Sequence, residues 1–149
     1  MSATIQELLS PVELGAWRGF LRAHAALTAE LDAQLQAEHG LSLSSYEVLL
    51  FLADSDTGRM RMSELARSVL LSRSGLTRLV DRLAQEGLIR REECPDDARG
   101  TFAVITPAGR ELFERARPTH LAGVRELFLS RFSQAEQRRL GALWERLVG

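Results

Sequence analysis

Three arginines near the middle of the chain, Arg73, Arg78 and Arg82, carry side chains suited to contacts with nucleic-acid bases. A guanidinium group is planar and can donate two hydrogen bonds at once, to O6 and N7 of guanine. Short hydroxyl side chains, which suit contacts with phosphate oxygens, occur in the same stretch: Ser72, Ser74 and Thr77. Residues 72–82 therefore contain both kinds of donor that a base-reading surface requires.

Two apolar stripes predict a pair of helices that would position these donors. The first stripe is Met62, Leu65, Ala66 and Val69, and the second is Leu76, Leu79, Val80 and Leu83. Both follow helical spacing, and they are separated by a change of phase at residues 70–72. Ser72 can cap the second helix, and Gly87 can end it in a left-handed conformation. On that helix the residues that point away from the apolar stripe are Ser74, Thr77, Arg78, Asp81 and Gln85, with Arg73 and Arg82 flanking them.

A hairpin is predicted directly after the second helix. Residues 88–93 and 101–105 are strand-like, and residues 94–100 between them are typical of a turn. Two short helices followed by a hairpin form a winged helix-turn-helix, which is a DNA-binding shape. The predicted fold class is mainly α with a small β-wing, flanked by N-terminal and C-terminal dimerisation helices.

The positive charge of the chain is concentrated in this region. The formal net charge is −1 overall, but residues 59–91 hold eight arginines against three acids, a net +5. Residues 1–58 have two arginines against eight acids, a net −6, and in residues 92–149 nine of each cancel. A local positive field is what neutralisation of phosphates requires.

The run from Met62 to Gly109 resembles the MarR family of dimeric winged-helix transcriptional regulators. It matches the helix pair, the Asp-x-Arg wing (Asp97 and Arg99) and the Thr-Pro-x-Gly exit that begins at Thr106. The resemblance implies that the second helix enters the major groove and that Arg99 enters the minor groove, with Asp97 orienting a basic neighbour. The predicted DNA-binding residues are Ser72, Arg73, Ser74, Thr77, Arg78, Arg82, Asp97 and Arg99.

Start and stop signals predict further helices on both sides. Residues 10–13 form a capping box that opens a helix of about 27 residues, or about 40 Å, ending at residues 39–40. Residues 44–47 form another capping box, which opens a buried helix to about Ala53, followed by a polar loop with a short strand at residues 59–61.

The C-terminal part is also predicted to be helical. A helix capped by Thr106 should run to about Ser130, kinked at Pro118, and Ser133 should open the last helix. These striped ends suit a homodimer that binds a palindromic operator. The predicted regions are 1–40 (N-terminal dimerisation helix), 41–106 (winged helix-turn-helix) and 107–149 (C-terminal dimerisation helices), within one structural domain.

Two interpretations of Trp17 and His24, which share a stripe of the first helix, stay open. They can be a core tryptophan beside a hydrogen-bonded histidine, which we favour, or they can bind a small aromatic or phenolic anion. The resemblance implies the second, because many members of the family release DNA when such a ligand binds. His120, in an apolar seam, is interpreted as packed or at the dimer interface.

Other classes of function find little support in the sequence. It has no phosphate-binding glycine loop and no nucleophile elbow, so we expect no enzyme, no catalytic residue and no cofactor. The histidines are scattered, so we expect no metal site. Cys94 has acidic neighbours that disfavour its thiolate and is interpreted as structural or incidental.

The sequence thus predicts a cytoplasmic protein with no membrane-spanning segment. We expect a sequence-specific DNA-binding regulator, a repressor released by a small aromatic ligand. The alternatives are a winged-helix protein-interaction module and a dimeric regulator with no small-molecule inducer.

Overall fold

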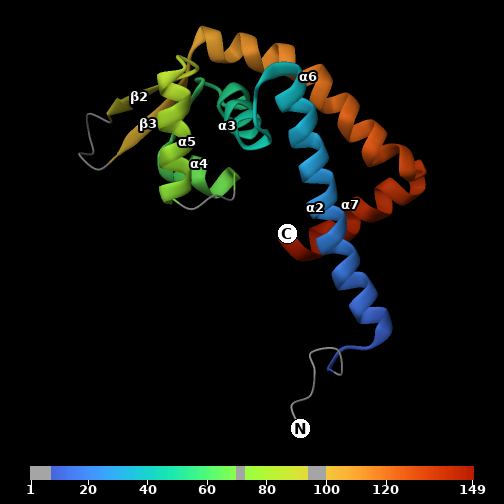
Figure 1. The fold of residues 1–149 in the computed structure, drawn as a ribbon. Helices are drawn as coiled ribbons and strands as arrows, with labels where there is room; N and C mark the ends of the chain where they lie inside the picture. Colours follow the sequence, from blue (N-terminus) through green and yellow to red (C-terminus); the bar gives the residue numbers. More distant parts are fainter. Residues whose placement is uncertain (1–7, 70–72, 94–99) are drawn as a thin grey trace.

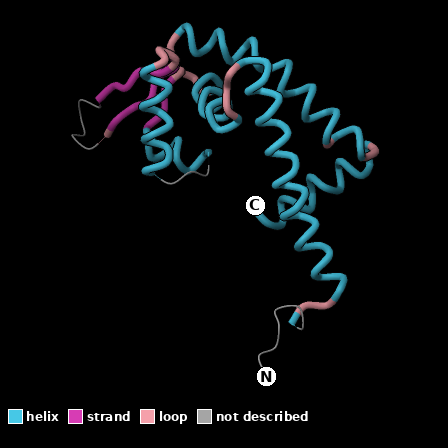
Figure 2. Tube along the Cα trace, in the orientation of Figure 1, coloured by secondary structure: helices cyan, strands magenta, loops and turns pink. Residues whose placement is uncertain are grey.

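The computed structural model describes residues 8–69, 73–93 and 100–149. Within these ranges the chain is mainly helical with a small antiparallel sheet, which confirms the predicted fold class (Figure 1). The elements are α2 (Pro11–His39), α3 (Leu43–Asp54), β1 (Arg59–Arg61), α4 (Met62–Val69), α5 (Arg73–Gln85), β2 (Ile89–Glu93), β3 (Thr101–Ile105), α6 (Pro107–Leu127), the 3-10 helix η1 (Leu129–Arg131) and α7 (Gln134–Val148). Figure 2 shows that the strands gather at one end of the molecule, beside α5.

Helix α2 begins and ends at the predicted signals. Ser10 Oγ accepts a hydrogen bond from the Glu13 N–H at 3.1 Å, and the Ser10 N–H donates to Glu13 Oε2 at 2.7 Å. Gly40 ends the helix with φ of 62°, a conformation that glycine adopts without strain. The N-terminal half of α2 extends away from the sheet and its helices, and within this chain Leu35 is the buried residue of α2 (Figure 1).

Helix α3 begins earlier than the capping box at residues 44–47 predicted. Its N-cap is Ser42, whose hydroxyl accepts the Ser45 N–H at 3.0 Å. The Leu43 N–H donates to Asp32 Oδ1 of α2 at 2.8 Å, so a side chain from another helix fixes the first turn. The predicted burial is confirmed, because Val48, Leu49 and Leu52 are fully buried.

Helix α6 is shorter than predicted. It ends at Leu127 instead of about Ser130, because Phe128 has non-helical backbone angles and η1 follows. The ring of Phe128 packs against that of Phe132 at 5.2 Å. The Gln137 amide of α7 donates to the carbonyl oxygens of Leu129 and Phe132, both at 3.1 Å. These contacts hold the turn into α7, which opens with the predicted capping box at Ser133.

The sheet has the strand order β1-β3-β2, with both pairs antiparallel. Ile89 and Ala103 are buried on the face that covers the hydrophobic core. Side chains alternate between the two faces of a strand, so Arg59, Arg90 and Glu92 lie on the opposite face. The sheet therefore covers the core with one face and carries Arg59, Arg90 and Glu92 on the other.

A short joint ties the end of α5 to the start of α6. Gly87 has φ of 77°, as predicted for the residue after the second helix. The Thr106 hydroxyl donates to the Gly87 carbonyl at 2.6 Å and accepts the Gly109 N–H at 3.1 Å. A Cβ atom at position 109 would overlap the carbonyl oxygen of Leu88. The Thr-Pro-x-Gly exit is therefore a close-packed junction that holds the hairpin and α5 at one place on α6.

The predicted packing of His120 is confirmed. Its ring lies 4.5 Å from that of Tyr46, and in the described part of the chain its buried Nδ1 has no hydrogen-bond partner. Burial lowers the pKa of His120 below its ordinary value of 6.5, because desolvation penalises the charged imidazolium.

This lowered pKa predicts a loss of stability in acid. The neutral ring contributes stability that is present above the ordinary pKa and is lost as the pH falls through the lower folded-state value. We expect the free energy of unfolding of the wild-type protein to fall more steeply between pH 7 and pH 5 than that of His120→Phe. Urea unfolding over this pH range tests it, and parallel pH profiles would contradict it.

Candidate nucleic-acid interface

The outward face of α5 carries the polar residues predicted for it. Its inward face is Leu76, Leu79, Val80 and Leu83, with relative exposures of 7% or less. The exposed residues are Ser74, Thr77, Arg78, Asp81, Arg82 and Gln85. Leu65 of α4 packs into the same core and supports α5 from behind. The side chains of Arg78 and Arg82 are therefore presented to the outside by a helix anchored through its leucines.

Three of the predicted DNA-binding residues are not among those that the structure describes. Ser72, Asp97, Arg99 and also Cys94 lie outside the described residues. Arg73 is the first residue of α5. Strands β2 and β3 lie on either side of residues 94–99 in the sequence, so the sheet fixes the two described ends between which that segment runs.

Arg91 on β2 is a functional candidate that the sequence did not reveal. Its Nη2 atom lies 3.0 Å from Asp81 Oδ1 and donates to the Thr77 carbonyl at 3.4 Å. Thr77 and Asp81 both lie on the outward face of α5. The alternation of side chains in β2 was the available signal, because Arg91 follows the buried Ile89 by two residues and shares its face.

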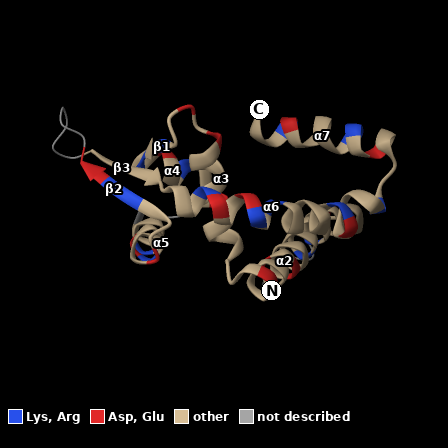
Figure 3. Ribbon diagram, turned by 90° about the horizontal axis from the view of Figure 1, so that it is seen from above, with Lys and Arg blue, Asp and Glu red and all other residues tan. Residues whose placement is uncertain are grey.

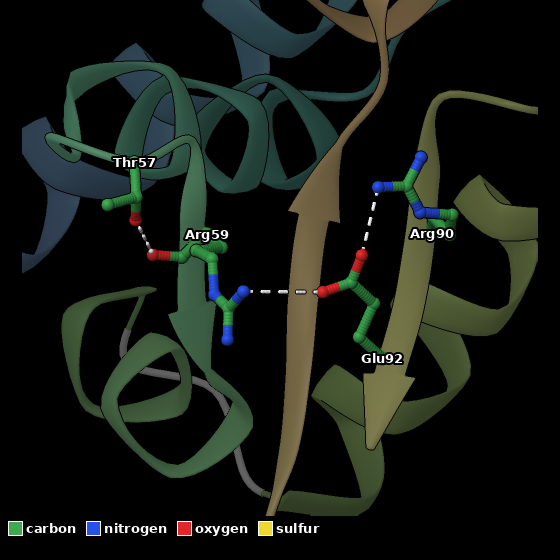
Figure 4. Close-up of polar contacts among 4 residues, drawn as sticks. All are labelled: Thr57, Arg59, Arg90 and Glu92. Carbon is green, nitrogen blue, oxygen red and sulfur yellow. Dashed lines mark hydrogen bonds and ion pairs between the residues drawn. The ribbon is translucent and has the colours of Figure 1, made fainter. Parts of the chain in front are cut away.

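The charged face of the sheet holds a second group of arginines, seen in Figure 4. Glu92 accepts from Arg59 Nη1 at 3.4 Å and from Arg90 Nη2 at 2.9 Å. The Arg59 guanidinium also lies 4.1 Å from the centre of the Phe102 ring, in cation–π geometry. One carboxylate is thus shared by two guanidinium groups, on the face of the sheet opposite the one from which Arg91 reaches α5, so Arg59 and Arg90 pair within the sheet and not with α5. Figure 3 shows the arginines of β2 and α5 at the same end of the molecule.

Comparisons with known proteins agree with this geometry. The MarR family model matches residues 39–100. The Streptomyces coelicolor MarR family regulator Sco3205, solved in complex with DNA, is 37% identical, with a TM-score of 0.89 over 94% of this chain and 88% of that one. The chain belongs to the MarR family.

Two further relatives extend the comparison. The MarR family regulator AbsC, also from Streptomyces coelicolor, is 36% identical, with a TM-score of 0.88 and 94% coverage of both chains. The transcriptional repressor YetL of Bacillus subtilis is 29% identical over 74% of this chain and 68% of its own length. These relatives are named as transcriptional regulators.

The predicted ligand residues lie on an exposed stripe of α2. Trp17 is 55% exposed, so the interpretation as a core tryptophan is wrong for the single chain. Its ring lies 6.2 Å from that of Phe20, which in turn lies 6.3 Å from the ring of His24 and 6.0 Å from that of Trp144. The reason is that the N-terminal half of α2 extends beyond the core (Figure 1). Trp144 of α7 lies beside Phe20 on this stripe.

The half-buried Glu47 of α3 is electrostatically coupled to His24 of α2. Burial raises the pKa of Glu47 above its ordinary value, and the charge of His24 acts in the opposite direction. The two helices thus each contribute one ionisable group to this electrostatic coupling.

Two further properties concern the described residues alone. None of their helices combines the length and apolar character needed to cross a membrane. They also contain no group of three or more His, Cys, Asp or Glu side chains placed to hold a metal ion.

Proposed function

We propose that this MarR-family DNA-binding transcriptional regulator reads its operator with the outward face of α5. The observation that carries the proposal is the exposure of Arg78 and Arg82 opposite the buried leucines of the same helix. B-DNA's major groove is wide enough for an α-helix, and paired donors on arginine match guanine. Arg78 and Arg82 would contact bases.

The other predicted residues complete this interface. Hydroxyl and guanidinium donors at the start of the helix would contact phosphates and bases there: Ser72, Arg73, Ser74 and Thr77. Arg99 would enter the minor groove, whose negative potential favours arginine, with Asp97 orienting a basic neighbour. The proposal for Asp97 and Arg99 rests on their match to the Asp-x-Arg motif of the family.

We further propose that the regulator acts as a homodimer on a palindromic operator. Large apolar side chains lie exposed on the two ends of the chain: Leu8, Leu9, Val12, Trp17, Phe20, Leu21, Leu121, Trp144, Leu147 and Val148. A second copy that covers them would remove this surface from water and place two α5 helices on adjacent half-sites. The regions 1–40 and 107–149 would then serve dimerisation, and 41–106 DNA binding.

Repression is the proposed direction of regulation. A dimer bound over a promoter blocks the polymerase by occupying its site, which needs no further contact. The relative YetL is named as a repressor, and its similarity to this chain supports the same direction here.

Release by a small aromatic or phenolic anion is proposed for the boundary between α2 and α3. The Trp17 ring would line this site beside the second copy that covers its stripe, and a protonated His24 would attract the anion. We expect hydroxybenzoates to release wild-type protein from its operator and to lose this effect on His24→Ala. Fluorescence anisotropy of labelled operator measures both, and equal release from the two proteins would contradict the assignment of His24.

The proposed function is tested by selecting bound sequences from random duplex DNA. We expect a two-fold symmetric site whose half-sites lie about one helical turn apart, with affinity that falls as salt rises. Selection that yields no enriched sequence, together with no salt-dependent binding, would favour a winged-helix protein-interaction module instead.

A further inference from the structure

One arginine of the wing sheet reaches onto the outward face of α5. Arg91 contacts Asp81 through an ion pair of 3.0 Å and the Thr77 carbonyl through a hydrogen bond of 3.4 Å. Thr77 and Asp81 are one helical turn apart, so the guanidinium lies along the helix between them. A single side chain of β2 therefore holds two successive turns of α5.

The charge on Asp81 is unexpected on a surface that faces DNA. It lies between Arg78 and Arg82 on the exposed face, where an unpaired carboxylate would repel phosphates. Charge alone would therefore make Asp81 a disadvantage for binding. A role in holding Arg91 accounts for an acid at this place.

We propose that Arg91, held by Asp81, is a positioning residue that fixes the wing strand β2 against the recognition helix α5. The inference rests on the proposed DNA binding. Because β2 leads directly into residues 94–99, the position of Arg91 on α5 determines where the wing meets the duplex relative to the bases that α5 contacts. The ion pair couples base recognition by the helix to contact by the wing.

The solvent exposure of the Arg91–Asp81 ion pair indicates that it contributes little to folding stability, so a positioning role can be tested separately. The Arg91 side chain is 35% exposed and that of Asp81 is 52% exposed. Ion pairs this accessible to water contribute little to folding, because solvent and salt screen them. Loss of the pair should therefore change DNA binding while leaving thermal unfolding nearly unchanged.

The experiment compares four variants on the selected operator and on random duplex DNA. Asp81→Asn and Arg91→Gln each remove one partner, and the double variant removes both. Arg90→Gln is the matched control, because it removes the same charge from the neighbouring position of β2, whose side chain lies on the opposite face and pairs with Glu92.

We expect Asp81→Asn and Arg91→Gln each to weaken operator binding about three- to fivefold, and the double variant to be no weaker than the weaker single variant. Arg90→Gln should change operator affinity less than about twofold. The base pairs at the outer ends of the selected site should lose preference in both single variants. Asp81→Asn should bind random DNA more tightly than wild type, since it removes a negative charge.

Three results would overturn the inference. The first is tighter binding of Asp81→Asn to the operator as well as to random DNA, and the second is equal behaviour of Arg91→Gln and Arg90→Gln. The third is unchanged preference at the outer base pairs. If wild-type protein bound no duplex at all, the proposed function would fail, and the role of Arg91 in DNA recognition would fail with it.

Discussion

Arg78→Ala is expected to weaken operator binding by about 1–3 kcal/mol, or roughly fivefold to 150-fold, and to relax the preference at one base pair. The reason is that Arg78 is exposed on α5 while the leucines of the same helix are buried. A guanidinium in that position can bond two acceptors of one guanine, which alanine cannot do. Anisotropy at fixed salt, with operators altered at single positions, measures both effects.

Arg115→Ala is the matched control for this prediction. Arg115 is an exposed arginine of α6, so its removal changes the net charge equally without altering α5. Its operator affinity should stay close to that of wild type. If Arg78→Ala kept both the affinity and the base preference of wild type, Arg78 would not be a base contact.

Phe20→Asp is expected to convert the dimer into monomers and to weaken operator binding by about 10²-fold to 10⁴-fold. Phe20 is 43% exposed and lies between the rings of Trp17 and Trp144, so a carboxylate there would be buried without a partner in the dimer. A monomer binds one half-site and loses the effective concentration of the second. Sedimentation velocity and a band-shift assay report the two effects.

Ala33→Glu is a suitable control for the change at Phe20. Ala33 is exposed on α2, and its helical position lies nearly opposite that of Phe20. It should leave the protein dimeric and able to bind its operator. A folded Phe20→Asp protein that stays dimeric, with circular dichroism like that of wild type, would show that the aromatic stripe is not the dimer surface.

Local chemistry explains why several helix boundaries could be predicted from the sequence. The Ser10–Glu13 capping box and Gly87 act within a few residues of themselves, so their outcome depends little on the rest of the chain. The apolar spacing of α5 also determines which residues face outward, and the exposure of Arg78 was predicted correctly for that reason. The same holds for the positive charge of residues 59–91, which is a property of composition.

Other features could not be predicted from the sequence, because they depend on contacts between segments that are far apart along the chain. Asp32 in α2 fixes the start of α3, and Gln137 in α7 holds the turn that follows α6. The pairing of Arg91 with Asp81 requires β2 to lie beside α5, and no local pattern encodes that distance. The exposure of Trp17 follows from the extension of α2 beyond the core.

The printed residues were sufficient to predict a winged helix-turn-helix with an arginine-bearing recognition helix, because capping, periodicity and charge act over short stretches of chain. Packing of the elements determined the partner of Arg91, the true start of α3 and the unburied aromatic stripe of α2. These features arise from side chains that meet only after the chain has folded, so they depend on distances in space and not on spacing along the sequence.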